Sequence, residues 1–191
     1  MNRTLAPFLL VALLVAFSLV GAKWQEVLPG FSPLPAVFFC VAARVGVRWL
    51  WVPLVAWLLS YPLTNLTQGY GWDFHIAIAF GGFAVAAGAG YSLRRRNWLA
   101  MMGGSIGAAI LFYAVTNTGS WLLLPQYSKT WAGFVQAQTV GVPGPIPPAW
   151  VFLRSSIAAS ALFSGLFLLG QRKWGLVPDG VTALSGIRAR R

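Results

Sequence analysis

Residues 74–115 have the sequence FHIAIAFGGFAVAAGAGYSLRRRNWLAMMGGSIGAAILFYAV. This stretch contains two apolar runs, residues 74–93 and 98–115, separated by three consecutive arginines at positions 94–96. An α-helix of roughly 20 apolar residues crosses a bilayer core about 30 Å thick. The stretch therefore predicts a pair of membrane-spanning helices joined by a short basic turn.

The rest of the chain has a similar composition. Of its 191 residues, 58% are hydrophobic and only 9% are charged, whereas a soluble domain carries roughly 25% charged residues. The acidic residues are limited to Glu26, Asp73 and Asp179. We therefore expect an all-α membrane protein with one helical domain, residues 1–172, and a basic cytoplasmic tail, residues 173–191.

Two more apolar runs, residues 5–22 and 150–170, predict the first and last spans. The first run also resembles a secretory signal peptide, because small residues at positions 20–22 form a candidate cleavage site. That alternative leaves the rest of the topology unchanged.

Residues 34–59 allow two interpretations. They form either one long helix that buries Arg44 and Arg48, or two shorter helices, about residues 34–43 and 49–63, that turn between them. Burying an arginine in the bilayer centre costs about 2.5–3.5 kcal/mol on insertion scales. This cost favours the hairpin, which raises the total to about six spans.

With about six spans, both ends of the chain lie in the cytoplasm and 11 of the 14 Lys and Arg residues are on the inside. Only Lys23, Lys129 and Arg154 remain outside. The positive-inside rule is therefore obeyed. We expect a multi-pass protein of the bacterial inner membrane, in contact with the lipid bilayer.

Small residues recur at three- or four-residue spacing on three predicted helices. Such stripes allow helix backbones to approach closely within one chain, and contacts between chains are the alternative. The stripes comprise Ala77, Gly81, Ala84 and Gly88, then Gly103 with Gly107 and Gly104 with Ala108, then Ser156, Ser160 and Ser164.

Residues for enzymatic chemistry are scarce. The chain has one histidine, His75, and one cysteine, Cys40, and it lacks both a catalytic carboxylate pair and a phosphate-binding loop. We therefore expect no enzyme, metal site or cofactor, with His75 as a haem or pigment ligand the alternative to an interfacial hydrogen-bonding role. Nucleic-acid binding is not expected, because the basic residues form short clusters between apolar runs.

Polar side chains gather on the predicted outer side, where they suggest a pocket. The connection after the third span contains Ser60, Tyr61 and Thr64, and residues 125–149 form a long connection of a kind that is usually functional. Arg154 either extends to the headgroups or faces the pocket as a cation. The candidate ligand-binding residues are Asn65, Thr116, Asn117, Trp121 and Arg154.

Two motifs carry a resemblance: Phe31-Ser32-Pro33, and FYAVTNTGSW at residues 112–121. They resemble an uncharacterised bacterial family of six-helix membrane proteins, itself similar to the substrate-binding (S) components of energy-coupling-factor transporters. The resemblance implies cytoplasmic termini, an outer pocket and a first helix that docks on a coupling subunit through A-x-x-x-A, matched here by Ala12 and Ala16. Relatives tend to have an aspartate after the third helix, where this chain has YPLTN at residues 61–65.

Two functions follow as expectations. The first is a small-solute capture or transport subunit, with a small-molecule ligand and with a coupling subunit and ATPases as partners. The alternative is an accessory structural subunit of a larger respiratory or photosynthetic membrane complex. In that case the small-residue stripes and the many tryptophans would be docking surfaces.

Overall fold

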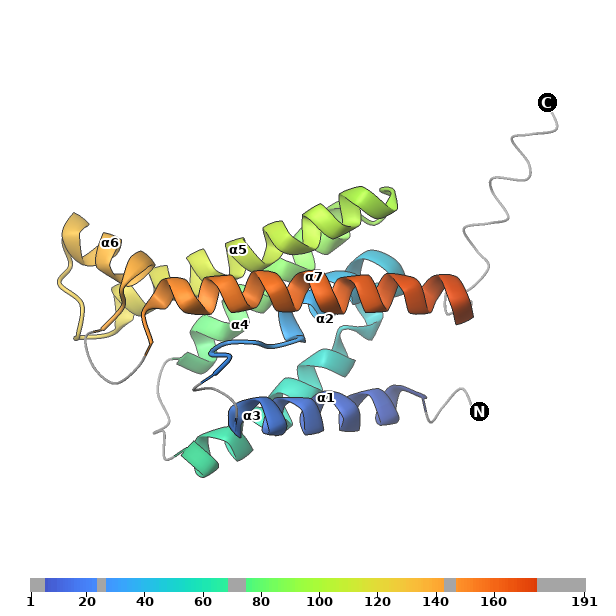
Figure 1. The fold of residues 1–191 in the computed structure, drawn as a ribbon, viewed down its shortest axis with the longest axis horizontal. Coiled ribbons are helices and arrows are strands. Elements are labelled where there is room, and N and C mark those ends of the chain that lie inside the picture. The colour runs from blue at the N-terminus through green and yellow to red at the C-terminus, as the bar shows by residue number, and fades with distance from the viewer. Residues whose placement is uncertain (1–5, 24–26, 69–74, 143–146, 175–191) are drawn as a thin grey trace.

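The computed structural model describes residues 6–23, 27–68, 75–142 and 147–174, and these residues contain helices and no strands (Figure 1). The all-α expectation is therefore confirmed for them. The α-helices are α1 (Ala6–Lys23), α2 (Leu34–Cys40), α3 (Trp51–Gln68), α4 (His75–Ser92), α5 (Trp98–Leu123), α6 (Trp131–Thr139) and α7 (Ala149–Trp174).

Residues 34–59, for which the sequence allows two interpretations, form a hairpin. Helix α2 continues into the π-helical turn η1 (Val41–Val45), the chain reverses at Gly46, and the 3-10 turn η2 (Val47–Trp49) leads into α3. Gly46 has φ 117° and ψ 152°, a conformation essentially restricted to glycine. The interpretation as a single long helix is therefore wrong.

Four helices, α2, α4, α5 and α7, form what we call the inner bundle. Short α2 packs against the other three, and its Phe39 is fully buried with Met101 and Ala108 of α5. A Cβ atom added to Gly90 of α4 would overlap the Phe39 carbonyl oxygen, and one added to Gly104 would lie 2.9 Å from the Phe39 ring. Helix α4 thus meets the backbone of α2 at Gly90, and α5 approaches the Phe39 ring at Gly104.

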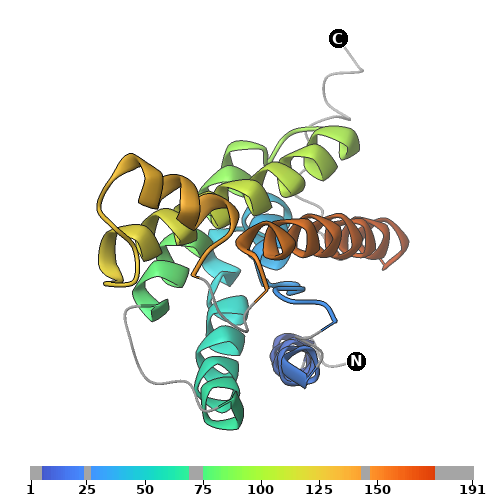
Figure 2. The same cartoon turned by 60° about the vertical axis from the view of Figure 1, so that its left-hand side comes forward.

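Helices α1 and α3 form a second unit, the α1–α3 pair. Val11 and Leu14 of α1 pack against Val52 and Ala56 of α3, and α1 lies at the edge of the molecule in both views (Figures 1 and 2). Aromatic rings connect the pair to the inner bundle: Trp57 lies 5.3 Å from Phe83 of α4, and Phe17 lies 5.0 Å from Phe163 of α7, between ring centroids.

The small-residue stripes divide into inward and outward positions. Ser160 and Ser164 are fully buried, and the Ser164 hydroxyl lies 3.5 Å from the sulfur of Met102. By contrast, a Cβ atom on Gly88, Gly103 or Gly107 would meet nothing within 4 Å. Close packing within the chain therefore accounts for Ser160 and Ser164, whereas these three glycines face open space.

Helix length and composition mark the chain as a membrane protein. Residues 75–92, 98–123 and 149–171 form helices long and apolar enough to cross a bilayer, and two further apolar helices, Phe8–Lys23 and Leu34–Val45, are shorter.

Several helix boundaries differ from those expected. Helix α3 continues to Gln68 and α5 to Leu123, past the expected ends at residues 63 and 115. The connection between residues 125 and 149 contains α6, whose first turn is capped by the Thr130 hydroxyl accepting from the Gly133 N–H at 3.2 Å. Helix α7 runs to Trp174, and the rest of the predicted tail lies outside the described residues.

Candidate functional site

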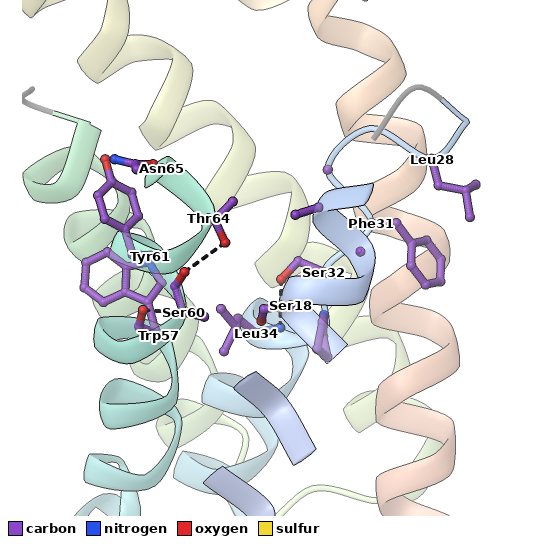
Figure 3. A pocket seen from close by; sticks show the side chains of 14 residues that line it. Ser18, Leu28, Phe31, Ser32, Leu34, Trp57, Ser60, Tyr61, Thr64 and Asn65 are labelled. Atoms are coloured by element: carbon purple, nitrogen blue, oxygen red, sulfur yellow. Dashed lines mark hydrogen bonds between the residues drawn. The ribbon is translucent and has the colours of Figure 1, made fainter. Parts of the chain in front are cut away.

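A cavity of about 290 Å³ lies where the α1–α3 pair meets the start of α2. Its wall is formed by the last turns of α1, by residues 28–34 that lead into α2, and by the second half of α3 (Figure 3). The site therefore combines three segments that are separate in the sequence.

Three serine hydroxyls in the cavity wall form hydrogen bonds with the backbone. The Ser18 hydroxyl donates to the Leu14 carbonyl at 2.9 Å and the Ser60 hydroxyl to the Trp57 carbonyl at 3.2 Å. The Ser32 oxygen accepts from the Leu34 N–H at 3.3 Å. Because a hydroxyl oxygen has two lone pairs, these serines present acceptors to a bound molecule.

The side-chain amide of Asn65 carries a hydrogen-bond donor that has no acceptor in the structure. The residue is only 7% exposed, and its side-chain Nδ2 has no hydrogen-bond partner. Leaving such a group buried and unpaired costs about 1–3 kcal/mol. Among the described residues, Arg44, Ser105, Ser160 and Gln171 also have a buried side-chain atom without a hydrogen-bond partner. None of these four residues lines the cavity.

The remaining wall is aromatic and uncharged. The Trp57 and Tyr61 rings lie 5.8 Å apart in an edge-to-face arrangement, and Phe31 lines the opposite side (Figure 3). No Lys, Arg, His, Asp or Glu belongs to the wall among the described residues. The cavity is therefore suited to an uncharged molecule with an apolar body and a few polar atoms.

Of the five candidate ligand-binding residues, only Asn65 lines this cavity. The Thr116 hydroxyl donates to the Phe112 carbonyl and the Asn117 amide to the Tyr113 carbonyl, each at 2.9 Å and within α5.

The other two candidates lie beyond the cavity as well. The Trp121 indole N–H donates to the Ser128 carbonyl at 2.9 Å. The Arg154 side chain is exposed, and its guanidinium carbon lies 5.7 Å from the Trp150 ring centroid.

The polar groups around residues 113–121 hold α6 against α5. The Tyr113 hydroxyl donates to the Gln138 carbonyl at 2.8 Å, and the Gln138 amide donates to the Thr118 hydroxyl at 3.0 Å. Nearby, burial raises the pKa of the Tyr127 phenol, and a hydrogen bond with the Val142 backbone partly offsets this. The motif at residues 112–121 therefore has a structural role in this fold.

Sequence reasoning did not select the serines of the cavity as ligand contacts. Ser60 belongs to the polar connection noted above, and Ser32 to the Phe31-Ser32-Pro33 motif. Ser18 is a single hydroxyl within an apolar run, and no sequence signal distinguishes it. Its place in the wall depends on how α1 packs against α3.

Two other groups of predicted residues are placed as follows. Ala12 and Ala16 are both exposed on α1, whereas Val11 and Leu14 are buried against α3.

His75 is exposed at the start of α4. No group of three His, Cys, Asp or Glu side chains suited to a metal ion occurs within the described part of the chain.

Residues 1–174 match the model of a family of unknown function, DUF6580. The chain belongs to this family. The match extends to the last residue of α7, so both the inner bundle and the cavity lie within the DUF6580 region. No curated protein and no solved structure matches the chain.

Proposed function

We propose that this DUF6580 chain is a membrane substrate-capture subunit that binds a small uncharged solute in the cavity beside α1 and α3. The observation that carries the proposal is the buried Asn65 side chain, because Asn65 lines the cavity and its Nδ2 has no hydrogen-bond partner. A ligand that supplies this acceptor removes the cost of the unpaired donor.

The volume and lining of the cavity indicate the size and the chemical groups of the proposed ligand. Ligand pockets usually enclose roughly 300–1,000 Å³, so a volume of about 290 Å³ favours a small molecule. The aromatic rings of Trp57, Tyr61 and Phe31 favour a flat apolar body. A carbonyl oxygen or a heterocyclic nitrogen would accept from Asn65, and a donor on the ligand would meet the serine oxygens.

The proposed topology has six spans in the bacterial inner membrane: α1, α2 with η1, α3, α4, α5 and α7. With both termini in the cytoplasm, α1 and α3 end on the outside and α2 begins there. The cavity then opens outward, and α6 also lies on the outer side. This arrangement keeps Arg44, Arg48 and residues 94–96 inside, as the positive-inside rule requires.

The proposed partners are a coupling subunit and ATPases, as in the transporters that the sequence resembles. The chain has no phosphate-binding loop of its own, so energy for transport would come from a partner. The exposed Ala12 and Ala16 are the proposed contact, because small residues allow a partner helix to approach closely.

The ligand proposal is tested by mass spectrometry of small molecules that accompany protein purified from its native membrane in mild detergent. We expect wild-type protein to carry an uncharged molecule. The Asn65→Ala variant should bind it about tenfold more weakly, since one hydrogen bond to the ligand is lost. The matched control is Asn117→Ala, whose amide is bonded within α5. A wild-type protein without any ligand, or equal retention by the Asn65 variant, would refute the proposal.

The partner proposal is tested by co-purification. We expect Ala16→Trp to lose the coupling subunit and ATPases, while Ala158→Trp, at an exposed position of α7, keeps them. Recovery of a large redox or pigment complex at fixed stoichiometry would instead support the accessory-subunit alternative.

A further inference from the structure

A second hollow, of about 270 Å³, lies at the turn between α4 and α5. It is lined by Tyr91, Ser92 and the three arginines at positions 94–96, whose side chains are all exposed. A fourth arginine joins them from another part of the chain, because Nη2 of Arg44 donates to the Arg96 carbonyl at 3.0 Å. Four guanidinium groups thus gather around one turn.

The charge of this cluster is not neutralised within the described structure. The chain contains only three acidic residues, and none of them falls in the described ranges. Four like charges in close proximity repel one another, so an anion from outside the chain would stabilise the turn. The uncompensated positive charge of the cluster therefore favours binding of an anion.

Two of the guanidinium groups are held in place before any ligand arrives. The guanidinium carbon of Arg94 lies 4.1 Å from the centroid of the Tyr91 ring, within cation–π range. Arg44 is fixed by its bond to the Arg96 carbonyl. Guanidinium groups bind phosphate oxygens in a forked geometry that lysine does not reproduce, and every cation of this cluster is an arginine. The chemistry favours a phosphate group.

The position of the turn indicates the source of that phosphate. The turn joins two helices, α4 and α5, that are each long and apolar enough to cross a bilayer. It therefore lies at a membrane surface, and the adjacent Trp98 is 52% exposed, as is typical of aromatic residues at the headgroup level. Phospholipid phosphates are concentrated at this depth.

We infer that the arginine turn between α4 and α5, together with Arg44, binds the phosphate of an anionic phospholipid headgroup. This site is separate from the cavity and does not depend on the proposed function. Leu34 lines the cavity at one end of the α2–η1 segment, and Arg44 reaches the arginine turn from the other end. The lipid would anchor the inner bundle at the surface opposite the cavity.

The test is native mass spectrometry of the detergent-purified full chain, titrated with phosphatidylglycerol or with zwitterionic phosphatidylcholine of the same acyl chains. We expect phosphatidylglycerol to be preferred. A basic residue near an anionic surface contributes roughly a fivefold change in binding, so Arg95→Gln should weaken it about fivefold and the triple Arg94→Gln, Arg95→Gln, Arg96→Gln variant about 100-fold.

Arg154→Gln is the control, because this exposed arginine lies on α7 beside Trp150 and should leave the preference unchanged. Helical circular dichroism verifies that each variant is folded, and the single Arg95→Gln variant keeps the test valid if the triple variant is not. Equal binding of the two lipids, or wild-type binding by Arg95→Gln, would overturn the inference. Saturation by inorganic phosphate at micromolar concentration, without competition from phosphatidylglycerol, would assign the site to a soluble phosphate instead.

Discussion

The inner bundle and the α1–α3 pair pack in different ways. In the inner bundle, Gly90 allows the backbone of α4 to contact the backbone of α2 at Phe39. In the pair, Val11 and Leu14 meet α3 through side chains. The junction with α2 leaves a cavity lined by Asn65, whose Nδ2 is unpaired. The comparison indicates that the inner bundle is closely packed and that the junction leaves room for the proposed ligand.

The largest expected effect is at Phe39, which is fully buried. Phe39→Ala should destabilise the protein by about 3–5 kcal/mol, since it removes contacts and leaves a void in the inner bundle. Phe31→Ala, in the cavity wall, should cost less than half as much, because this ring is only partly buried. Unfolding in mixed micelles measures both, and equal losses would remove the distinction between the two regions.

A pair of glycines on α4 provides a sharper comparison. Gly90→Ala should cost about 1–3 kcal/mol by overpacking, since its Cβ atom would overlap the Phe39 carbonyl. Gly88→Ala, two residues earlier, faces open space and should be neutral or stabilising by up to about 1 kcal/mol through helix propensity. Thermal unfolding of both variants tests this. Tolerance of alanine at Gly90 would mean that α2 and α4 are not in backbone contact.

We expect Asn65 to lower the stability of the ligand-free protein and to contribute to ligand binding. Asn65→Leu should stabilise the ligand-free protein by about 1 kcal/mol, because it removes an unpaired buried donor, and it should abolish ligand retention. The measurement combines unfolding with small-molecule mass spectrometry. A destabilised variant would show that Asn65 has a structural role rather than a role in the cavity.

The smallest effect is expected at Thr116. Its hydroxyl is bonded within α5, so Thr116→Val should change stability by less than about 0.5 kcal/mol and leave ligand retention unaltered. A large loss of ligand in this variant would favour residues 116–121 as the binding region and would contradict the position assigned to the site.

The sequence predicted the helical class, the basic turn after α4 and the reversal near Gly46, because these depend on apolar run length and on the cost of burying arginine. It could not predict which face of a helix packs inward. Glycine recurs on two faces of α4, and only the contact with Phe39 distinguishes Gly90 from Gly88. A periodic pattern alone does not contain that information.

The residues that line the cavity were predicted only in part, for a similar reason. Asn65 was selected because it lies in a polar connection, and the structure places it in the cavity. Thr116 and Asn117 were selected as polar residues at the outer end of the fifth predicted helix, but their side chains bond to carbonyls of their own helix. Helix α6 was not expected either, since a nine-residue amphipathic helix between proline-containing segments gives a weak signal.

The most direct test of the central claim is cysteine labelling in intact cells. Ser32→Cys places a thiol in the cavity wall, in a Cys40→Ala background that removes the native cysteine. The account predicts labelling by a membrane-impermeant maleimide from outside the cell. It also predicts that the small-molecule fraction extracted from wild-type protein slows this labelling. Labelling only after the membrane is permeabilised, or labelling that the extract does not affect, would contradict an outward-facing binding cavity.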